Sequence, residues 1–241
     1  MAETNLAAAP PEVRSRLAVA LDMDDAVAAL RVARELQPWF GVAKVGLELY
    51  SAAGPDVVGG LHDLGLAVFC DLKLHDIPTT VGKAARVIGS LGARYLNFHA
   101  QGGVAMLTAG VDGFLGGAAD AGLDAPVALA VTVLTSDGDA PPHILGKRVQ
   151  AALEAGCGGV VCAAVDVHEV KQLGPRLITV VPGIRPAGTD RHDQARAATP
   201  EGAVAAGADV LVIGRAVTHA DDPTAAAAAI AEAVAATART S

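Results

Sequence analysis

Short apolar runs alternate with longer, more polar segments along nearly the whole chain, and this alternation constrains the fold more than any other feature. The runs consist mainly of Val, Leu, Ile and Ala, which is typical of parallel strands buried on both faces. They occupy residues 17–21, 43–45, 67–72, 95–99, 127–134, 159–162, 177–181 and 210–213.

Segments with helical character separate these runs and occupy residues 25–37, 55–64, 79–91, 103–121, 142–155, 167–173 and 200–206. Strands and helices in alternation indicate βαβ units and a parallel sheet. Eight runs in 241 residues fit the α/β class as a single (β/α)8 or TIM barrel, which takes about 250 residues and carries its helices outside. We expect one barrel domain over residues 1–241, with residues 1–15 as a loose N-terminal extension. The alternative is an open doubly wound sheet, but no Gly-x-Gly-x-x-Gly turn follows the first run.

Turn and capping residues support the same boundaries. Glycines stand just before several runs, where they would end the preceding helix, and they are Gly65, Gly92, Gly122, Gly156 and Gly207. Asp222 followed by Pro223 is typical of a helix start. We therefore expect a terminal helix in the Ala-rich stretch that follows.

Composition and charge exclude several classes of function. The chain has 18 basic and 26 acidic residues, a net charge of −8 without a basic run, so a nucleic-acid backbone would be repelled. A small anionic ligand is still compatible, since one pocket can be locally positive. The three cysteines show no metal-ligand spacing, and neither an apolar leader nor a segment able to span a bilayer is visible. We expect a cytoplasmic protein with no metal and with neither nucleic acid nor membrane as partner.

Charged residues stand at the ends of the first three runs, where barrels place their active sites. Asp22 follows the first run, Lys44 lies in the second, and Asp71, Lys73 and Asp76 end the third. Side chains two apart on a strand share a face, so we expect Asp71 and Lys73 to point into the same pocket. A single pair of this kind could be a solvated ion pair of little consequence. So many charges on one rim favour a catalytic centre.

Two arginines follow the last two runs. Gly214 and Arg215 end the eighth run, and Arg185 follows the seventh. Barrels commonly bind phosphate with the loops after these strands, where Gly allows close backbone approach and Arg donates paired hydrogen bonds. For Arg215 alone, a salt bridge at a helix start is the alternative. Together the residues predict an anion site on the rim.

With these residues assembled, the sequence closely resembles the orotidine 5'-phosphate decarboxylases over residues 19–218. The signature of that family matches DLKLHDIP at 71–78, and its bacterial branch matches VTVLTS at 131–136, PGIRP at 182–186 and VIGR at 212–215. The Asp-x-Lys-x-x-Asp core of the signature is shared with sister barrels of other activity. The remaining motifs make the resemblance specific.

The resemblance implies a cofactor-free enzyme of pyrimidine biosynthesis that converts orotidine 5'-monophosphate to uridine 5'-monophosphate. Lys73 would be the catalytic lysine, with Asp71 beside the substrate carboxylate. Asp22 and Lys44 would hold the ribose hydroxyls, and Lys44 would also belong to a charged tetrad with Asp71, Lys73 and Asp76. The carbanion left by loss of CO2 would be stabilised electrostatically and protonated by Lys73.

The same likeness implies a homodimer with shared active sites, in which Asp76 and Thr80 reach into the partner's site. Thr135, or Ser136 beside it, would contact the pyrimidine. The ligands of the phosphate would be Arg185, Gln194, Gly214 and Arg215. Gln194 lies in the polar stretch 188–199, which would close over the ligand as a lid.

Two rival functions remain open. A Mg2+-dependent sugar-phosphate decarboxylase or synthase of the same superfamily would share Asp-x-Lys-x-x-Asp. Such enzymes look different at the second strand, where a carboxylate helps to hold the metal, because that place is Lys44 here. A non-catalytic sensor of a phosphate ligand would keep the barrel and lose the tetrad, whose residues are all present. Thr79 is a local departure from the family, which commonly has Asn at this position. We expect it to affect the local turn and not the activity.

Overall fold

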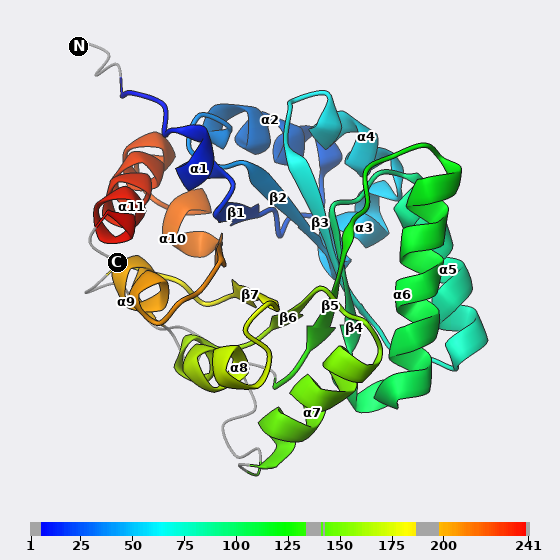
Figure 1. Ribbon diagram of the computed structural model, residues 1–241. Coiled ribbons are helices and arrows are strands. Elements are labelled where there is room, and N and C mark those ends of the chain that lie inside the picture. The colour runs from blue at the N-terminus through cyan, green and yellow to red at the C-terminus, as the bar shows by residue number, and fades with distance from the viewer. Residues whose placement is uncertain (1–5, 134–140, 142, 187–197, 240–241) are drawn as a thin grey trace.

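The described part of the chain forms a closed barrel of parallel strands with helices around it (Figure 1). The computed structural model of the chain describes residues 6–133, 141, 143–186 and 198–239. Within these residues, eight strands pair in sequence order and the last pairs with the first, which confirms the predicted (β/α)8 barrel. The strands are β1 (Leu17–Ala20), β2 (Val42–Gly46), β3 (Ala67–Leu74), β4 (Tyr95–His99), β5 (Val127–Val131), β6 (Gly159–Val161), β7 (Ile178–Val181) and β8 (Val210–Ile213).

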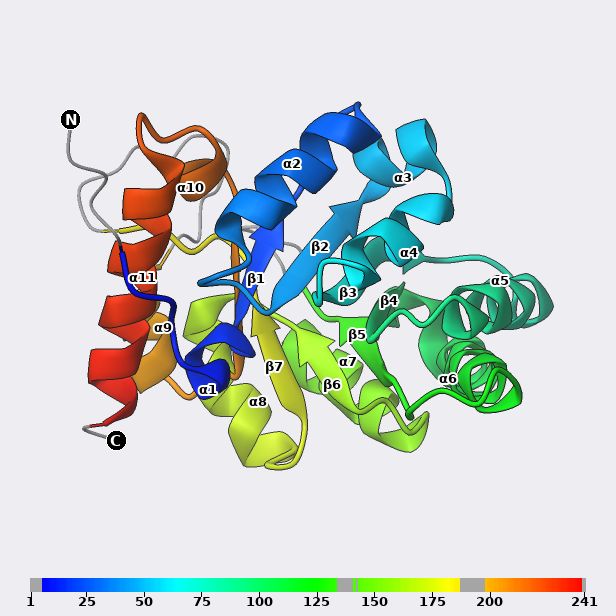
Figure 2. The same ribbon diagram turned by 90° about the horizontal axis from the view of Figure 1, so that it is seen from above.

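Helices cover the outside of the barrel, with α11 beside α1 on one side and α5 beside α6 on the opposite side (Figure 1 and Figure 2). The described helices are α1 (Pro11–Arg14), α2 (Ala26–Leu36), α3 (Leu47–Ala53), α4 (Asp56–His62), α5 (Pro78–Ser90), η1 (Ala100–Gly102), α6 (Gly103–Asp120), α7 (His143–Glu154), η2 (Ala164–Asp166), α8 (Val167–Leu173), α9 (Pro200–Ala205), α10 (Arg215–Thr218) and α11 (Pro223–Ala238). The sequence pattern missed α1 and α10, whose 4 residues each are too few for a clear period, and α3, which follows β2 without a separating turn. None of the helices in the described residues is both long and apolar enough to cross a membrane.

Alternation along the strands divides the buried side chains into two layers. On β1, Val19 packs outward against the helices, whereas Ala18 and Ala20 point into the barrel. The interior layer is apolar and consists of Ala18, Ala20, Val42, Phe69, Leu129, Val131, Val161, Val180, Val210 and Val212. The next inward positions toward the carboxyl ends of β2 and β3 are Lys44 and Asp71. The charged residues therefore lie directly above the apolar layer.

Local sequence signals set the helix boundaries. Asp25 and Asp222 cap α2 and α11, each accepting a hydrogen bond from the backbone N–H three residues on, at 2.6 and 2.9 Å. At the other helix ends the predicted glycines have positive φ, as at Gly92 (86°) and Gly207 (95°). A residue with a Cβ atom would be strained there, so these glycines end the helices as predicted.

Residues 6–15, which we expected to be loose, pack against the bottom of the barrel, the end formed by the amino termini of the strands. Val13 of α1 is buried. The indole N–H of Trp39, in the loop before β2, donates a hydrogen bond to the carbonyl of Ala7 at 3.1 Å. The described part of the extension is therefore joined to the barrel by an apolar contact and a hydrogen bond.

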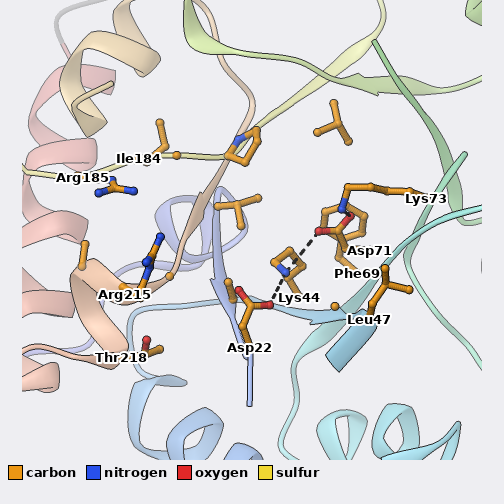
Figure 3. Close-up of a pocket in the computed structure, with 18 of the residues that line it drawn as sticks. Asp22, Lys44, Leu47, Phe69, Asp71, Lys73, Ile184, Arg185, Arg215 and Thr218 are labelled. Carbon is orange, nitrogen blue, oxygen red and sulfur yellow. Dashed lines mark hydrogen bonds and ion pairs between the residues drawn. The ribbon is translucent and has the colours of Figure 1, made fainter. Parts of the chain in front are cut away.

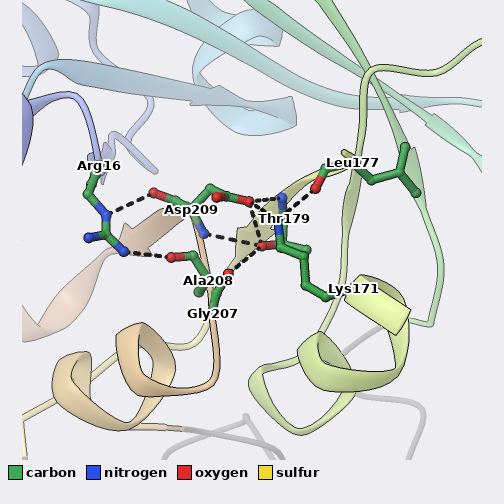
Figure 4. Close-up of polar contacts among 7 residues, drawn as sticks. All are labelled: Arg16, Lys171, Leu177, Thr179, Gly207, Ala208 and Asp209. Carbon is green, nitrogen blue, oxygen red and sulfur yellow. Dashed lines mark hydrogen bonds and ion pairs between the residues drawn. The ribbon is translucent and has the colours of Figure 1, made fainter. Parts of the chain in front are cut away.

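A polar network closes the bottom of the barrel between β7, β8 and β1 (Figure 4). The Asp209 carboxylate, just before β8, accepts hydrogen bonds from the backbone N–H and the hydroxyl of Thr179 at 2.7 and 2.9 Å. It also accepts one from the Lys171 ammonium at 2.6 Å. Arg16, just before β1, donates to the carbonyl of Ala208 at 2.8 Å. One carboxylate and one guanidinium thus link β7 to β8 and β8 to the start of β1.

Replacing Asp209 by Ala should lower the stability of the barrel. The substitution leaves Thr179 and Lys171 without their shared acceptor, and we expect a loss of about 1–3 kcal/mol in the free energy of unfolding, measured by urea. The matched control is Asp120→Ala, which removes an exposed ion pair with Arg86 and should cost less than about 1 kcal/mol. Equal losses in the two variants would contradict the role given to the network.

Candidate active site

The carboxyl ends of the strands surround a pocket of about 1190 Å³ (Figure 3). Phe69, Val131 and Val212 contribute apolar lining. Figure 3 shows Arg185 and Arg215 together on the side of the pocket away from Lys73. The described lysines, arginines and carboxylates that line the pocket are Asp22, Lys44, Asp71, Lys73, Arg185 and Arg215.

Four of these side chains form a row of alternating charge. The Lys44 ammonium lies 2.8 Å from Asp22 Oδ1 and 3.4 Å from Asp71 Oδ2. The Lys73 ammonium lies 2.6 Å from Asp71 Oδ1. The row crosses the carboxyl ends of β1, β2 and β3. The structure thus brings together four residues that sequence reasoning placed on one rim.

The row is most deeply buried at Lys44, which is 7% exposed. The Asp22 side chain is 57% exposed and that of Lys73 is 35% exposed. Burial alone raises the pKa of the Asp71 carboxyl, but the charges of Lys44 and Lys73, with hydrogen bonds from Lys73 and Asn97, outweigh burial. The pKa of Asp71 therefore lies below its ordinary value. Asp71 is a carboxylate at neutral pH and holds an ammonium group on each side.

The backbone at Lys73 differs from that of a regular strand. The pairing of β3 with β4 shifts register between Cys70 and Leu74, which marks a bulge. Within it, Lys73 has a φ of 49°, and no other non-glycine residue among those described has positive φ. The side chains of Asp71 and Lys73 meet as we expected. They do so through a bulge with a left-handed residue, however, and not through the two-residue repeat of a strand.

Sequence reasoning missed Asn97 on β4 as a functional residue. Its side chain is buried, its oxygen accepts a hydrogen bond from the Lys73 backbone N–H, and its amide donates one to Asp71 Oδ1, both at 2.7 Å. The signal available in the sequence was an amide inside a mostly apolar strand. Strands disfavour this residue type, and burial penalises it unless it is hydrogen-bonded.

Two histidines flank the same part of the rim. His75 follows β3 and His99 ends β4, and their rings stack with centroids 5.4 Å apart. Burial lowers the pKa of His99, and the charges of Arg148, His75 and Lys73 lower it further. His99 is therefore neutral at neutral pH, and its Nδ1 accepts a hydrogen bond from the Gln101 N–H at 3.3 Å. This arrangement favours a structural role for both rings, which support the rim of the barrel.

The other side of the pocket is formed after β7 and β8. Gly214 ends the last strand, and Arg215 opens α10. Arg185 lies after β7, where its backbone N–H donates to the carbonyl of Ala198 at 2.9 Å. Most of the predicted lid, residues 188–199, lies outside the described residues. The hydrogen bond joins the described residues on either side of that segment.

Two of the predicted site residues are described but do not line the pocket, and two more lie outside the described residues. Asp76 and Thr80 are exposed and are not among its described lining residues. Asp76 Oδ1 accepts a hydrogen bond from the N–H of Ile77 at 2.6 Å, just before α5. Thr135 and Gln194 lie outside the described residues. Within the described ranges, no group of three or more His, Cys, Asp and Glu side chains is arranged to hold a metal ion.

Comparison with known proteins decides the family. The model of the "Orotidine 5'-phosphate decarboxylase / HUMPS family" matches residues 15–230. The chain belongs to this family. Proteins named orotidine 5'-phosphate decarboxylase from Moorella thermoacetica and Anaeromyxobacter dehalogenans are 45% and 48% identical to it over 230 and 227 residues. These alignments cover 90% of this chain and 91% and 96% of the two relatives.

Solved structures agree with this assignment to the orotidine 5'-phosphate decarboxylase / HUMPS family. The crystal structure of orotidine 5'-phosphate decarboxylase from Lactobacillus acidophilus is similar, with a TM-score of 0.74 and 34% identity. The match covers 90% of this chain and 98% of that one. A structure from Pyrococcus horikoshii, at 23% identity and a TM-score of 0.75, shares the fold.

Asp71 should stabilise this family member in a pH-dependent way. Because its pKa is lowered in the folded chain, the carboxylate contributes stability above the ordinary Asp pKa of about 3.9, and the contribution is lost as the pH falls through the folded value. We expect Asp71→Asn to unfold at lower urea concentration than the wild type near neutral pH, by a margin that shrinks below about pH 4. The control is Asp24→Asn, an exposed position close to the same rim. A margin for Asp71→Asn that is unchanged at about pH 3 would contradict this expectation.

Proposed function

We propose that this chain decarboxylates orotidine 5'-monophosphate to uridine 5'-monophosphate in pyrimidine biosynthesis, in the cytoplasm. The observation that carries the proposal is one pocket with two unlike sides, a lysine–carboxylate row on one and two arginines on the other (Figure 3). Relatives at 45% and 48% identity bear the name of this activity. The buried cysteines fit a reducing compartment.

The arginine side of the pocket binds the phosphate in this proposal. Guanidinium groups match phosphate oxygens with paired, charge-assisted hydrogen bonds, so Arg185 and Arg215 are suited to this role. Gly214 lets the backbone approach, and Gln194 is the fourth ligand. Because the phosphate is remote from the reacting carbon, its binding energy can hold the pyrimidine ring in place for the reaction.

The middle of the substrate is held between the two sides. Asp22 and Lys44, which form an ion pair at 2.8 Å, bind the ribose hydroxyls in this proposal. Thr135, or Ser136, contacts the pyrimidine. This orientation directs carbon 6 of the ring toward Lys73, at the far end of the row.

The reaction breaks the bond between carbon 6 and its carboxylate. CO2 leaves, and the electron pair stays on carbon 6 in the plane of the ring, where it has no resonance sink. The Lys73 ammonium faces this charge, transfers a proton to carbon 6, and regains a proton from water. At about 4 Å and an effective dielectric of about 20, the attraction is about 4 kcal/mol. Asp71, at 2.6 Å from Lys73 Nζ, orients the ammonium toward carbon 6.

Lys44 favours this reaction over the Mg2+-dependent chemistry of the sister enzymes. A divalent cation in the row would stand beside the Lys44 ammonium, which is already 2.8 Å from Asp22 and 3.4 Å from Asp71. Mg2+ is bound through carboxylates, and both of these carboxylates are engaged by a cation. The donor set present here therefore fits charge stabilisation by lysine better than metal binding.

A homodimer with shared sites is part of the proposal. Asp76 and Thr80 are exposed in the single chain, although the family resemblance gives them roles at the substrate. Ile77 between them is 66% exposed, and Leu47, at the end of the neighbouring strand β2, is 60% exposed. Exposed apolar side chains at the rim are suited to subunit contact. In the dimer, Asp76 and Thr80 complete the partner's site, where Asp76 joins the charged row.

A spectrophotometric assay tests the function. Purified protein in EDTA should convert orotidine 5'-monophosphate, followed by its loss of absorbance, and Lys73→Ala should abolish turnover while the protein still folds. Removal of the ammonium eliminates both the charge stabilisation and the proton donor. Absence of turnover by folded wild-type protein would refute the proposal and direct attention to sugar phosphates with Mg2+ restored.

A mixing experiment tests the shared site. Asp76→Ala and Lys73→Ala should each be inactive alone. In a mixed dimer, one site combines the intact Lys73 of one subunit with the intact Asp76 of the other. Random exchange should therefore restore about one quarter of wild-type activity. Inactivity after proven subunit exchange would show that Asp76 does not act across subunits.

A further inference from the structure

Asn97 is a buried amide for which the proposed chemistry gives no direct role. Its neighbours Leu96 and Phe98 pack outward with the helices, so Asn97 faces the barrel interior, beside Leu129 of β5. It is 0% exposed. A buried carboxamide has an acceptor oxygen and a donor nitrogen, and each needs a partner to offset the loss of water.

The Asn97 side chain fills an interruption in the β3–β4 ladder. The regular pairing stops at Cys70 and resumes at Leu74. In the interval, the Asn97 oxygen accepts a hydrogen bond from the Lys73 N–H and its amide donates to Asp71 Oδ1, both at 2.7 Å. Side-chain hydrogen bonds therefore replace the backbone ladder at the bulge.

Both hydrogen bonds act on groups of the charged row. Asp71 Oδ1 accepts from the Asn97 amide at 2.7 Å and from the Lys73 ammonium at 2.6 Å, which leaves Oδ2 directed to Lys44 at 3.4 Å. The bond to the Lys73 backbone holds a residue whose φ of 49° is unfavourable for a side chain with Cβ. One amide thus contacts both the carboxylate and the backbone that carries the ammonium.

We infer that Asn97 is a positioning residue for decarboxylation, whose carboxamide sets the Asp71 carboxylate and the Lys73 ammonium in their relative geometry. The inference rests on the proposed function. Asn97 is not among the described residues that line the pocket, so it acts through these two side chains. The position requires an acceptor on one side and a donor on the other. A protonated Asp could supply both, an ionised Asp only the acceptor, and Leu neither.

Asn97→Asp is the informative substitution, with Asn97→Leu as a control of similar size. Near neutral pH, Asn97→Asp should lose roughly 100-fold in kcat, with a smaller change in KM because Arg185 and Arg215 still bind phosphate. Repulsion between the introduced carboxylate and Asp71 raises the pKa of the pair. Once protonated, the introduced group donates to Asp71 as the amide did. The ratio of variant to wild-type kcat should therefore rise about tenfold between about pH 8 and about pH 5.

Asn97→Leu should show the loss of kcat without the rise at low pH. Ratios to wild type are needed because neighbouring groups on β2, β3 and β4 and after β3 titrate or carry charge. These groups are Lys44, Asp71, Lys73, His75 and His99. They are the same in all the proteins compared, so the difference between the two ratios isolates the introduced carboxyl.

The outcomes separate this inference from the proposed function. If the wild type does not turn over orotidine 5'-monophosphate, the proposed function fails and the inference fails with it. If the wild type is active and folded Asn97→Asp keeps wild-type kcat, or loses activity in a ratio independent of pH, the positioning role is overturned. Circular dichroism and thermal melting establish folding. Should Asn97→Leu not fold, Asn97→Ala serves as the variant that lacks both hydrogen bonds.

Discussion

The rest of the site depends on one lysine ammonium held out of water between two carboxylates. Lys44 is 7% exposed, and a buried ammonium without partners would cost several kcal/mol. Asp22 and Asp71 offset this cost at 2.8 and 3.4 Å. Because Lys44 engages one oxygen of Asp71, the other oxygen is available to Lys73. The alternating order of charge therefore holds the outer ammonium beside a carboxylate where it borders the pocket.

The barrel can hold this row because its interior is layered. Below the row, the inward side chains are mostly Ala and Val, and they exclude water from the base of the charged groups. Small residues also leave space for a ligand, since Ala20 lines the pocket where a larger side chain would fill it. The two-residue alternation of side chains that builds the apolar layer thus also points Lys44 and Asp71 into the barrel. They lie one layer nearer the carboxyl ends of the strands.

Much of this arrangement could be predicted from the sequence, because it follows from strand periodicity. The alternation of runs and helices identified the closed barrel, and charges at the run ends identified Asp22, Lys44 and Asp71 as neighbours. Boundaries were less certain, as where the run at 127–134 gives a strand that ends at Val131. The hydrophobic period of a strand does not show where its backbone departs from regular geometry.

The features that could not be predicted all depend on contacts between distant segments. The left-handed backbone at Lys73 depends on a hydrogen bond from another strand, and Asn97 gains its role from the same contact. Periodicity assigns Asn97 to the barrel interior but cannot show that it faces a bulge. The proposed role of Asp76, which is exposed in the single chain, likewise depends on a contact with a second subunit.

The two sides of the pocket come from opposite ends of the chain and are joined where β8 pairs with β1. The pairs Leu17–Leu211 and Val19–Ile213 form this seam. At its top, a Cβ atom on Gly214 would lie 3.5 Å from that of Ala20, so the arginine side is built directly against β1. At its bottom, Arg16 bonds to the carbonyl before β8. The separation between the two arginines and Lys73 is therefore set by closure of the barrel. In the proposed reaction, this rigid framework lets phosphate binding at the arginines hold the ring in place at Lys73.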